Sequence, residues 1–298
     1  PEFGSYLPTD VAWLLTDLSE VTLEAPVAER ERAMQGGGHY AESLPIEYQP
    51  DVTYIELFNT ALAASSTRVA QAVATVGEQI LRIRGTHTVL ASLARAGTPI
   101  GVLLRRWAHD VHGLDWPHYS VSIVRDRGID QIALSYIATQ HDPRDVIFVD
   151  GWTGKGAITN ELTQAVRAAN EVLGTSFDDA LAVLADPGHC VPIFGTRDDF
   201  LIPSACLNST VSGLVSRTVL NPKFVGAGQF HGAKFYRDLA PNDVSNALID
   251  RIAAHFPDLP RLSSEVAPES QPPDWRGWRA VVSVAAEFGI TNLNLVKP

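Results

Sequence analysis

The 298-residue sequence predicts an α/β fold: an open, mostly parallel sheet of about five strands with helices on both faces, preceded by an N-terminal helical region. Two observations indicate this fold. From residue 88 onward, short and almost wholly apolar segments such as 146–149 and 180–185 recur along the chain. Longer helical patterns separate them. Short apolar strands that alternate with helices are typical of a parallel sheet covered on both faces.

The expected elements follow in a regular order. In the N-terminal region we expect helices at 9–18 and 54–83, with a loop at 35–50 between them. The core has predicted strands at 88–93, 119–124, 146–149 and 180–185, and predicted helices at 100–111, 130–139, 157–173, 202–219 and 243–256.

The chain divides into four expected parts. Residues 6–86 form the N-terminal helical or hood region, and residues 87–258 form the α/β core. Residues 259–274 are rich in Pro, Ser and Glu and are predicted to be a linker. Residues 275–298 would begin a further segment, with a strand expected at 290–296 and the natural chain expected to continue beyond Pro298.

Composition excludes several classes of protein. The formal charge of -11 disfavours non-specific nucleic-acid binding by the core. A small phosphorylated ligand remains compatible, because a few backbone N–H groups and one or two cations can hold it. Two cysteines are too few for a disulfide framework, and neither a long apolar stretch nor a signal peptide is present. We therefore expect a cytoplasmic protein without membrane contact.

The most informative segment is 145–159, DVIFVDGWTGKGAIT. An apolar strand ends in Asp150, and a turn with Thr153 and several glycines then opens a helix. Ligands of open parallel sheets bind beyond the carboxyl ends of the strands. Glycines let the main chain fold around an anion, and the free N–H groups of the helix start point towards it. The spacings of Walker A and dinucleotide-binding loops are both absent here.

Segment 145–159 resembles the loop that binds phosphoribosyl diphosphate (PRPP) in type I phosphoribosyltransferases. In that family an apolar strand, two acids and a turn rich in hydroxyl groups and glycine lead into a helix. Segment 91–100, ASLARAGTPI, resembles the family's other loop, which binds the diphosphate. The two segments lie about fifty residues apart, in the order that the family uses.

The resemblance implies a role for each matching residue. Asp150 would contact the ribose hydroxyls, while ligand oxygens and water would hold most of the Mg²⁺ coordination shell. The residues implied to hold the 5′-phosphate are Thr153, Gly154, Lys155 and Gly156, and those implied to hold the diphosphate are Arg95, Ala96 and Gly97.

The sequence departs from the family at two places. Gly151, which also belongs to the ligand loop, stands where a second acid is usual. The lid over the diphosphate is reduced to the few residues between Val124 and Asp130. Arg125 and Arg127 in that segment are candidate catalytic cations, or else solvated loop charges.

Asp186 follows the next predicted strand and is a candidate for contacting the acceptor base. A role in stabilising the Pro187-Gly188 turn explains its position equally well.

More narrowly, the chain resembles phosphoribosyltransferase-like proteins encoded with tellurite-resistance (ter) stress genes, the StiP family, which are sometimes called cysteine proteases. The match runs from about Val11 to Pro260 and includes segments 38–40 and 197–210. The resemblance implies PRPP or a nucleoside monophosphate as ligand, an unidentified base, a stress-response role in nucleotide metabolism and a homodimer. It also implies that residues 275–298 begin a Pelota-like RNA-binding segment.

Two alternative functions stay open. A cysteine protease would use Cys190 or Cys206 and needs a thiolate paired with an imidazole. His189 adjoins Cys190, but neighbouring side chains generally diverge, whereas His231 could approach either cysteine in the fold. A non-catalytic nucleotide sensor would need the ligand loops alone. The histidines show no spacing typical of metal ligands.

Overall fold

The structure, a computed structural model, describes residues 3–260 and 272–291. Its centre is a seven-stranded sheet in the order β1-β6-β5-β8-β9-β10, with β7 beside β6. All neighbouring strands are parallel except β6 and β7. The strands are β1 (Ala12–Trp13), β5 (Val89–Ala94), β6 (His118–Val124), β7 (Gly128–Ile129), β8 (Val146–Trp152), β9 (Leu181–Ala185) and β10 (Ile193–Thr196). The predicted α/β fold with a mostly parallel sheet is confirmed.

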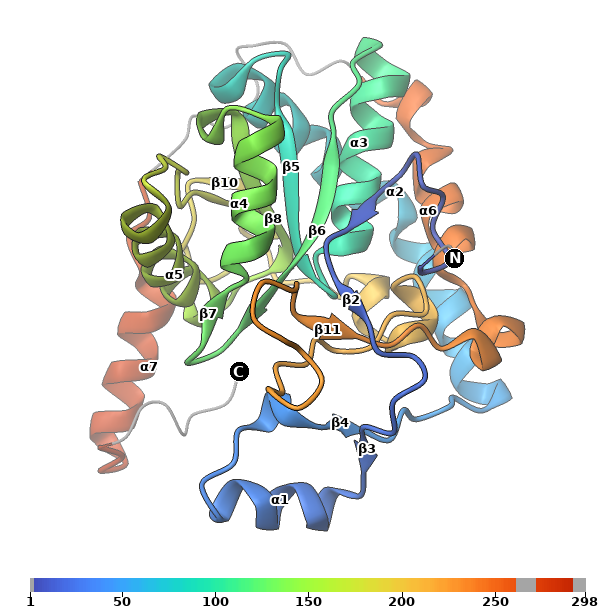
Figure 1. Cartoon of the computed structure of the whole chain (residues 1–298). Helices are drawn as coiled ribbons and strands as arrows, with labels where there is room; N and C mark the ends of the chain where they lie inside the picture. Colours follow the sequence, from blue (N-terminus) through green and yellow to red (C-terminus); the bar gives the residue numbers. More distant parts are fainter. Residues whose placement is uncertain (1–2, 261–271, 292–298) are drawn as a thin grey trace.

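Helices cover both faces of the sheet, as predicted (Figure 1). Helices α2 (Val52–Arg84), α3 (Thr98–His112) and α6 (Ser245–Ala253) pack together on one face, and α4 (Gln131–Gln140) and α5 (Ala157–Leu173) cover the other. Alternate strand residues point to opposite faces. Along β8, Ile147 and Val149 therefore join the core under α2 and α3, while Val146 and Phe148 join the core under α4 and α5.

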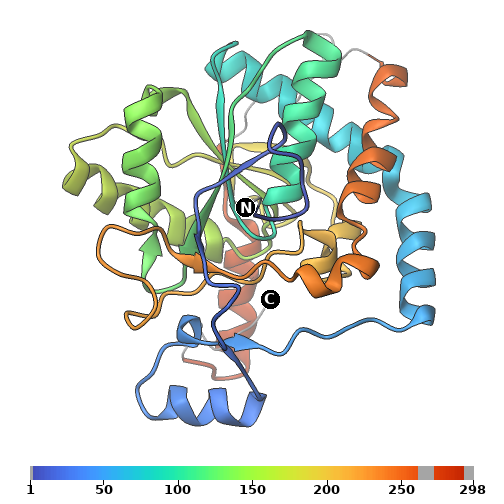
Figure 2. The same cartoon turned by 45° about the vertical axis from the view of Figure 1, so that its right-hand side comes forward.

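Short elements of the N-terminal and C-terminal halves lie across one end of the sheet (Figure 1). Strand β2 (Thr16–Asp17) pairs with β11 (Gly232–Ala233), and β3 (Glu24–Ala25) pairs with β4 (Leu44–Pro45). Helix α1 (Val27–Gln35) lies farthest from the sheet, and an extended chain leads from β4 to α2 (Figure 2). The 3₁₀ helices are Tyr40–Glu42, Pro143–Asp145, Pro203–Ala205, Ser209–Val211, Arg237–Asn242 and Phe256–Asp258.

The predicted helix at 9–18 is wrong. Val11, Leu14, Leu15 and Leu18 have helical spacing, and all four are buried. The chain is nevertheless extended, because β1 pairs with β6 and β2 pairs with β11. Tertiary pairing therefore overrides the local pattern.

The predicted helix at 202–219 is also wrong. Two 3₁₀ turns occupy its first half, and Gly213 and Leu214 then adopt left-handed conformations, with φ of 76° and 58°. Residues 215–219 continue as an extended segment that forms bridges Val215↔Phe235 and Val219↔Gly232. Strand β10 was not predicted. Helix α5 has its predicted bounds, and the other predicted helices and strands of the core are present with shifted ends.

Helix α7 (Arg276–Glu287) begins against the core rather than as a separate unit. The backbone N–H of Trp275 donates to the carbonyl of His189 at 3.0 Å, and that of Gly277 donates to Gly188 at 3.0 Å. Most of the predicted linker, at 261–271, and most of the expected strand, at 292–296, lie outside the described residues. Within the described residues, no helix combines the length and apolar character needed to span a bilayer.

Gly77→Ala in α2 is expected to destabilise the protein although alanine favours a helix by about 1 kcal/mol. An added Cβ would lie 2.3 Å from the ring of Trp107, which is fully buried on α3. Such overpacking costs about 1–3 kcal/mol, and the helix propensity of alanine offsets about 1 kcal/mol of this cost. A net loss of about 1 kcal/mol should lower the thermal midpoint by roughly 2–4 °C. Thr67→Ala, at an exposed site of the same helix, is the control and should not lower the midpoint.

Candidate functional site

The register of β5 and β8 brings the two predicted ligand loops together. Ser92 pairs with Val149, so the loop after Ala94 and the carboxylate of Asp150 leave the sheet at the same edge. Gly97 closes the first loop against β8. A Cβ there would lie 2.5 Å from the carbonyl oxygen of Val149, so the close approach requires glycine.

A cavity of about 380 Å³ lies beyond these strand ends. Its lining includes Arg95, Ala96 and Asp150, which are three of the residues that the sequence assigned to the ligand. Another part of the lining comes from segment 204–217 and includes Asn208 and Arg217. The structure therefore unites residues from three separate parts of the chain around one polar space.

Asp150 has an unusual carboxyl group. Burial disfavours its charged form and raises its pKa to about 7, although the backbone N–H of Gly151 donates to Oδ1 at 2.8 Å and opposes the shift. Near neutral pH the group is therefore divided between its protonated and ionised forms. In either form it can hydrogen-bond to a sugar hydroxyl.

Arg95 is held in place by the N-terminal region and by segment 204–217. Its Nη1 lies 2.8 Å from Oε1 of Glu47 and 3.2 Å from the carbonyl of Val215, while Nη2 donates to Asn208 at 3.2 Å. The peptide bond between Ala94 and Arg95 is cis. Glu47, absent from the sequence prediction, follows β4 and neutralises much of the charge on Arg95.

The turn between β8 and α5 has the features of an anion-binding loop. Gly156 begins α5 in a left-handed conformation, with φ of 79°, and no side chain caps the helix. The hydroxyl of Thr153 is buried and has no hydrogen-bond partner among the described residues. Free N–H groups at a helix start favour an anion. The predicted residues Thr153–Gly156 adjoin the cavity, which Ile158 lines, but do not themselves line it.

No steric clash explains why Gly151 stands where related loops have a second acid. The nearest atom to an added Cβ at this position would be Cγ1 of Ile100, at an ordinary contact distance of 3.8 Å. An added Cβ would therefore fit at this position.

Arg125, Arg127 and Lys155 lie away from Asp150. Arg125 and Lys155 border a separate cavity of about 690 Å³, beside Trp278 of α7. Arg127 borders a third cavity, of about 360 Å³. The arrangement thus does not support the assignment of Arg125 and Arg127 as catalytic partners of Asp150.

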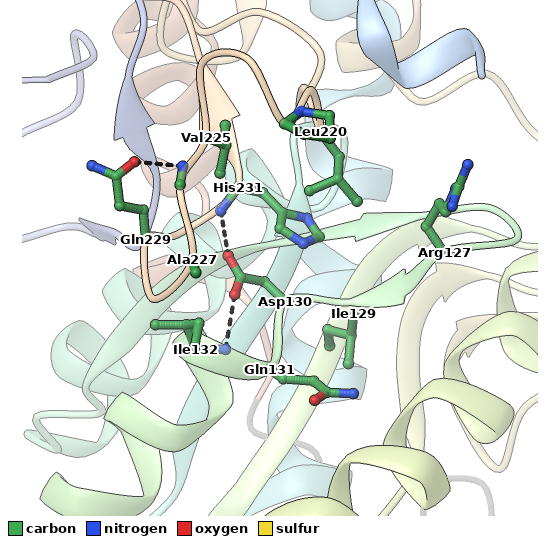
Figure 3. Close-up of a pocket in the computed structure, with 12 residues that line it drawn as sticks. Arg127, Ile129, Asp130, Gln131, Ile132, Leu220, Val225, Ala227, Gln229 and His231 are labelled. Atoms are coloured by element: carbon green, nitrogen blue, oxygen red, sulfur yellow. Dashed lines mark hydrogen bonds between the residues drawn. The ribbon is translucent and has the colours of Figure 1, made fainter. Parts of the chain in front are cut away.

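The cavity beside Arg127 contains polar groups that the fold already uses (Figure 3). The carboxylate of Asp130 accepts hydrogen bonds from the backbone N–H groups of Ile132 and Ala133 at the start of α4. It also accepts one from the backbone of His231, at 2.6 Å. These contacts join α4 to the segment that contains β11, so Asp130 is structural.

Asp186 anchors a loop and does not line the cavity. Its carboxylate is fully buried, accepts hydrogen bonds from the backbone of Cys190 and Val191, and pairs with Arg197. Of the two explanations that the sequence left open, this geometry favours stabilisation of the 187–191 turn over contact with a base.

Neither cysteine has the surroundings of a nucleophile. Burial raises the pKa of the Cys190 thiol to about 12, and its Sγ lies 3.6 Å from the carbonyl of Gly154. Burial also raises the pKa of Cys206. In the described part of the chain, no hydrogen bond joins either thiol to a histidine, and the ring of His231 bonds to Ser122.

The described residues include no cluster of three or more His, Cys, Asp and Glu side chains that could hold a metal ion. Among the residues that line the 380 Å³ cavity, Asp150 is the only carboxylate. This donor set fits a magnesium ion only if the ligand supplies most of the oxygens.

Arg217 is the main residue that the sequence analysis missed. It is a lone charge in the apolar and hydroxyl-rich run 209–219, and this isolation is the signal that could have singled it out. Its importance depends on the extended path of 215–219, which the predicted helix concealed.

Fold and site together define an open-sheet α/β protein with a polar cavity at the carboxyl ends of adjacent parallel strands. A profile of the family described as "Tellurite-like stress resistance cysteine protease StiP" matches residues 4–253. The chain therefore belongs to the StiP family. The protein named cysteine protease StiP from Acinetobacter baylyi is 36% identical, over 99% of this chain and 79% of its own length.

The fold is also similar to a solved structure of HGPRT-ase from Leishmania tarentolae in complex with GMP. The identity is 14% and the TM-score 0.31, over 46% of this chain and 74% of the other.

Asp150→Asn should reveal the raised pKa through stability. Between about pH 4 and pH 7 the folded wild type holds a proton that the unfolded chain has lost, so its stability falls as pH rises. The variant has no such group. A shift of about three pKa units corresponds to about 4 kcal/mol, so the thermal midpoint of the variant relative to wild type should rise by roughly 8–16 °C from pH 4 to pH 8. Asp145→Asn, just before the same strand, is the control, and equal behaviour of both variants would contradict the shift.

Proposed function

We propose that the protein binds PRPP or a ribose 5-phosphate nucleotide in the 380 Å³ cavity and transfers or removes the phosphoribosyl group on an unidentified base. The observation that supports this most is the meeting of Arg95, Ala96 and Asp150 at one edge of the sheet. Segments 91–100 and 145–159 each resemble a PRPP-binding loop, and the parallel register of β5 and β8 makes the two segments neighbours.

The chemistry needs orientation and charge stabilisation more than acid–base catalysis. As diphosphate leaves, the sugar gains oxocarbenium character and the departing oxygens gain negative charge. Arg95 and the N–H groups of its loop are suited to those oxygens. Asp150 would orient the ribose hydroxyls, and Thr153 with the start of α5 would hold the 5′-phosphate.

Magnesium is part of the proposal. When bound, it would neutralise the diphosphate, coordinated mainly by ligand oxygens and water, with Asp150 as the nearest protein carboxylate. Cytoplasmic location and homodimer formation stay predictions.

Titration of PRPP with Mg²⁺ by calorimetry tests the ligand. Thr153→Ala removes a buried hydroxyl that lacks a partner among the described residues. The loss of one hydrogen bond to a charged phosphate should weaken binding by about tenfold. Thr139→Ala, on α4, is the control and should bind like wild type.

Absence of binding by wild type to PRPP and to ribose 5-phosphate would refute the proposal. Binding that is not followed by diphosphate release with any offered base would favour the nucleotide sensor.

A cysteine protease is the second candidate, and the description of the family and the name of its A. baylyi member support it more directly than they support a transferase. One structural observation favours it: Cys190 borders a cavity of about 430 Å³ beside Trp275. The high thiol pKa opposes it, because the thiolate is the nucleophile.

A peptide-cleavage assay separates the two candidates. We expect no cleavage near neutral pH, and slow alkylation of Cys190 that accelerates as pH rises towards 12, where the thiol ionises. Cleavage that Cys190→Ser or Cys206→Ser abolishes, with PRPP binding unchanged, would establish the protease instead.

A further inference from the structure

Arg217 lies on a buried segment that is hydrogen-bonded to the chain around β11. Its neighbours Val215, Ser216, Thr218 and Val219 are all buried, while Arg217 itself is exposed. Backbone hydrogen bonds from Ser216 to Lys234, at 2.9 Å, and from Val219 to Gly232, at 2.7 Å, fix this segment beside β11. The fold therefore fixes the backbone position of Arg217 at the cavity.

The two arginines of the cavity differ in their partners. Arg95 has an ion pair with Glu47 and hydrogen bonds to Asn208 and Val215. The guanidinium of Arg217 has no hydrogen bond or ion pair within residues 3–260 and 272–291. Arg217 is therefore a second positive charge of the cavity that has no direct ion pair among the described residues, and Glu47 offsets it only at longer range.

Electrostatics support an anion at this position. Partial burial lowers the pKa of Arg217, and the like charge of Arg95 lowers it further. Two cations held near each other repel, and an anion between them would remove the repulsion. The sequence otherwise has an excess of negative charge, with a formal value of -11.

We propose that Arg217 is a ligand-binding residue of this cavity, where it holds the diphosphate end of the ligand opposite Arg95. This inference rests on the proposed function. Arg125 and Arg127, on the short hairpin between β6 and β7, border other cavities. In their place, segment 215–219 would supply the second cation of the 380 Å³ cavity. A planar guanidinium can form two parallel hydrogen bonds to phosphate oxygens.

The test compares three probes by calorimetry in the presence of Mg²⁺: PRPP, inorganic diphosphate and ribose 5-phosphate. Arg217→Ala should weaken the binding of PRPP and of diphosphate by tenfold or more. It should leave the affinity for ribose 5-phosphate within about twofold of wild type. Arg217→Lys should give an intermediate loss, because lysine keeps the charge without the fork.

Arg167→Ala is the matched control, since it removes the same charge from an exposed site on α5. It should change none of the three affinities. Thermal midpoints equal to wild type would show that every variant is folded.

The outcomes distinguish this inference from the proposed function. If wild type and Arg217→Ala bind PRPP equally, Arg217 is a solvated surface charge and the inference fails while the function stands. An equal loss for ribose 5-phosphate would overturn the assignment to the diphosphate end. Failure of wild type to bind any of the three probes would refute the function itself.

Discussion

The parallel pairing of β5 with β8 is the constraint on which the candidate site depends. It sets Ser92 opposite Val149, so the strand ends at Ala94 and Asp150 cannot separate without breaking the centre of the sheet. Gly97 strengthens this constraint, because its lack of a side chain lets the loop contact the carbonyl of Val149. Segments about fifty residues apart in sequence become one surface through backbone geometry alone.

Charge within the cavity differs from charge over the rest of the chain. Glu47 forms a direct ion pair with Arg95 and acts on Arg217 only at longer range, and the pKa of Asp150 is raised to about 7. Near neutral pH, Asp150 is partly protonated and offsets less of the arginine charge. The net charge of the cavity is therefore more positive than a fully ionised Asp150 would give. A protein with a strongly negative formal charge can in this way select a compact anion while it repels extended polyanions.

The sequence predicts those elements whose local pattern agrees with their packing. Its predictions are wrong where contacts between residues far apart in the chain determine the backbone conformation. Helix α5 spans 157–173 as predicted, because its apolar face and its flanking glycines favour the same bounds. At 9–18 the helical spacing is real, but pairing with β6 and β11 keeps the chain extended. Bridges to distant residues likewise keep 215–219 extended, so the sequence alone could not assign Arg217 to the cavity. Glu47 could be recognised only through its ion pair with Arg95.

Cys190 shows why loss of function after mutation of a cysteine would not by itself identify a nucleophile. Its sulfur lies 3.6 Å from the carbonyl of Gly154 and would lie 3.0 Å from a Cβ on Gly156. Gly188 approaches Gly154 so closely that only glycine fits, and Gly277 donates to the carbonyl of Gly188. The thiol is thus packed between the turn that joins β8 to α5 and the start of α7. A substitution there can move Thr153 and Gly156, and so could abolish the phosphate binding that we propose for this turn without any chemistry at sulfur.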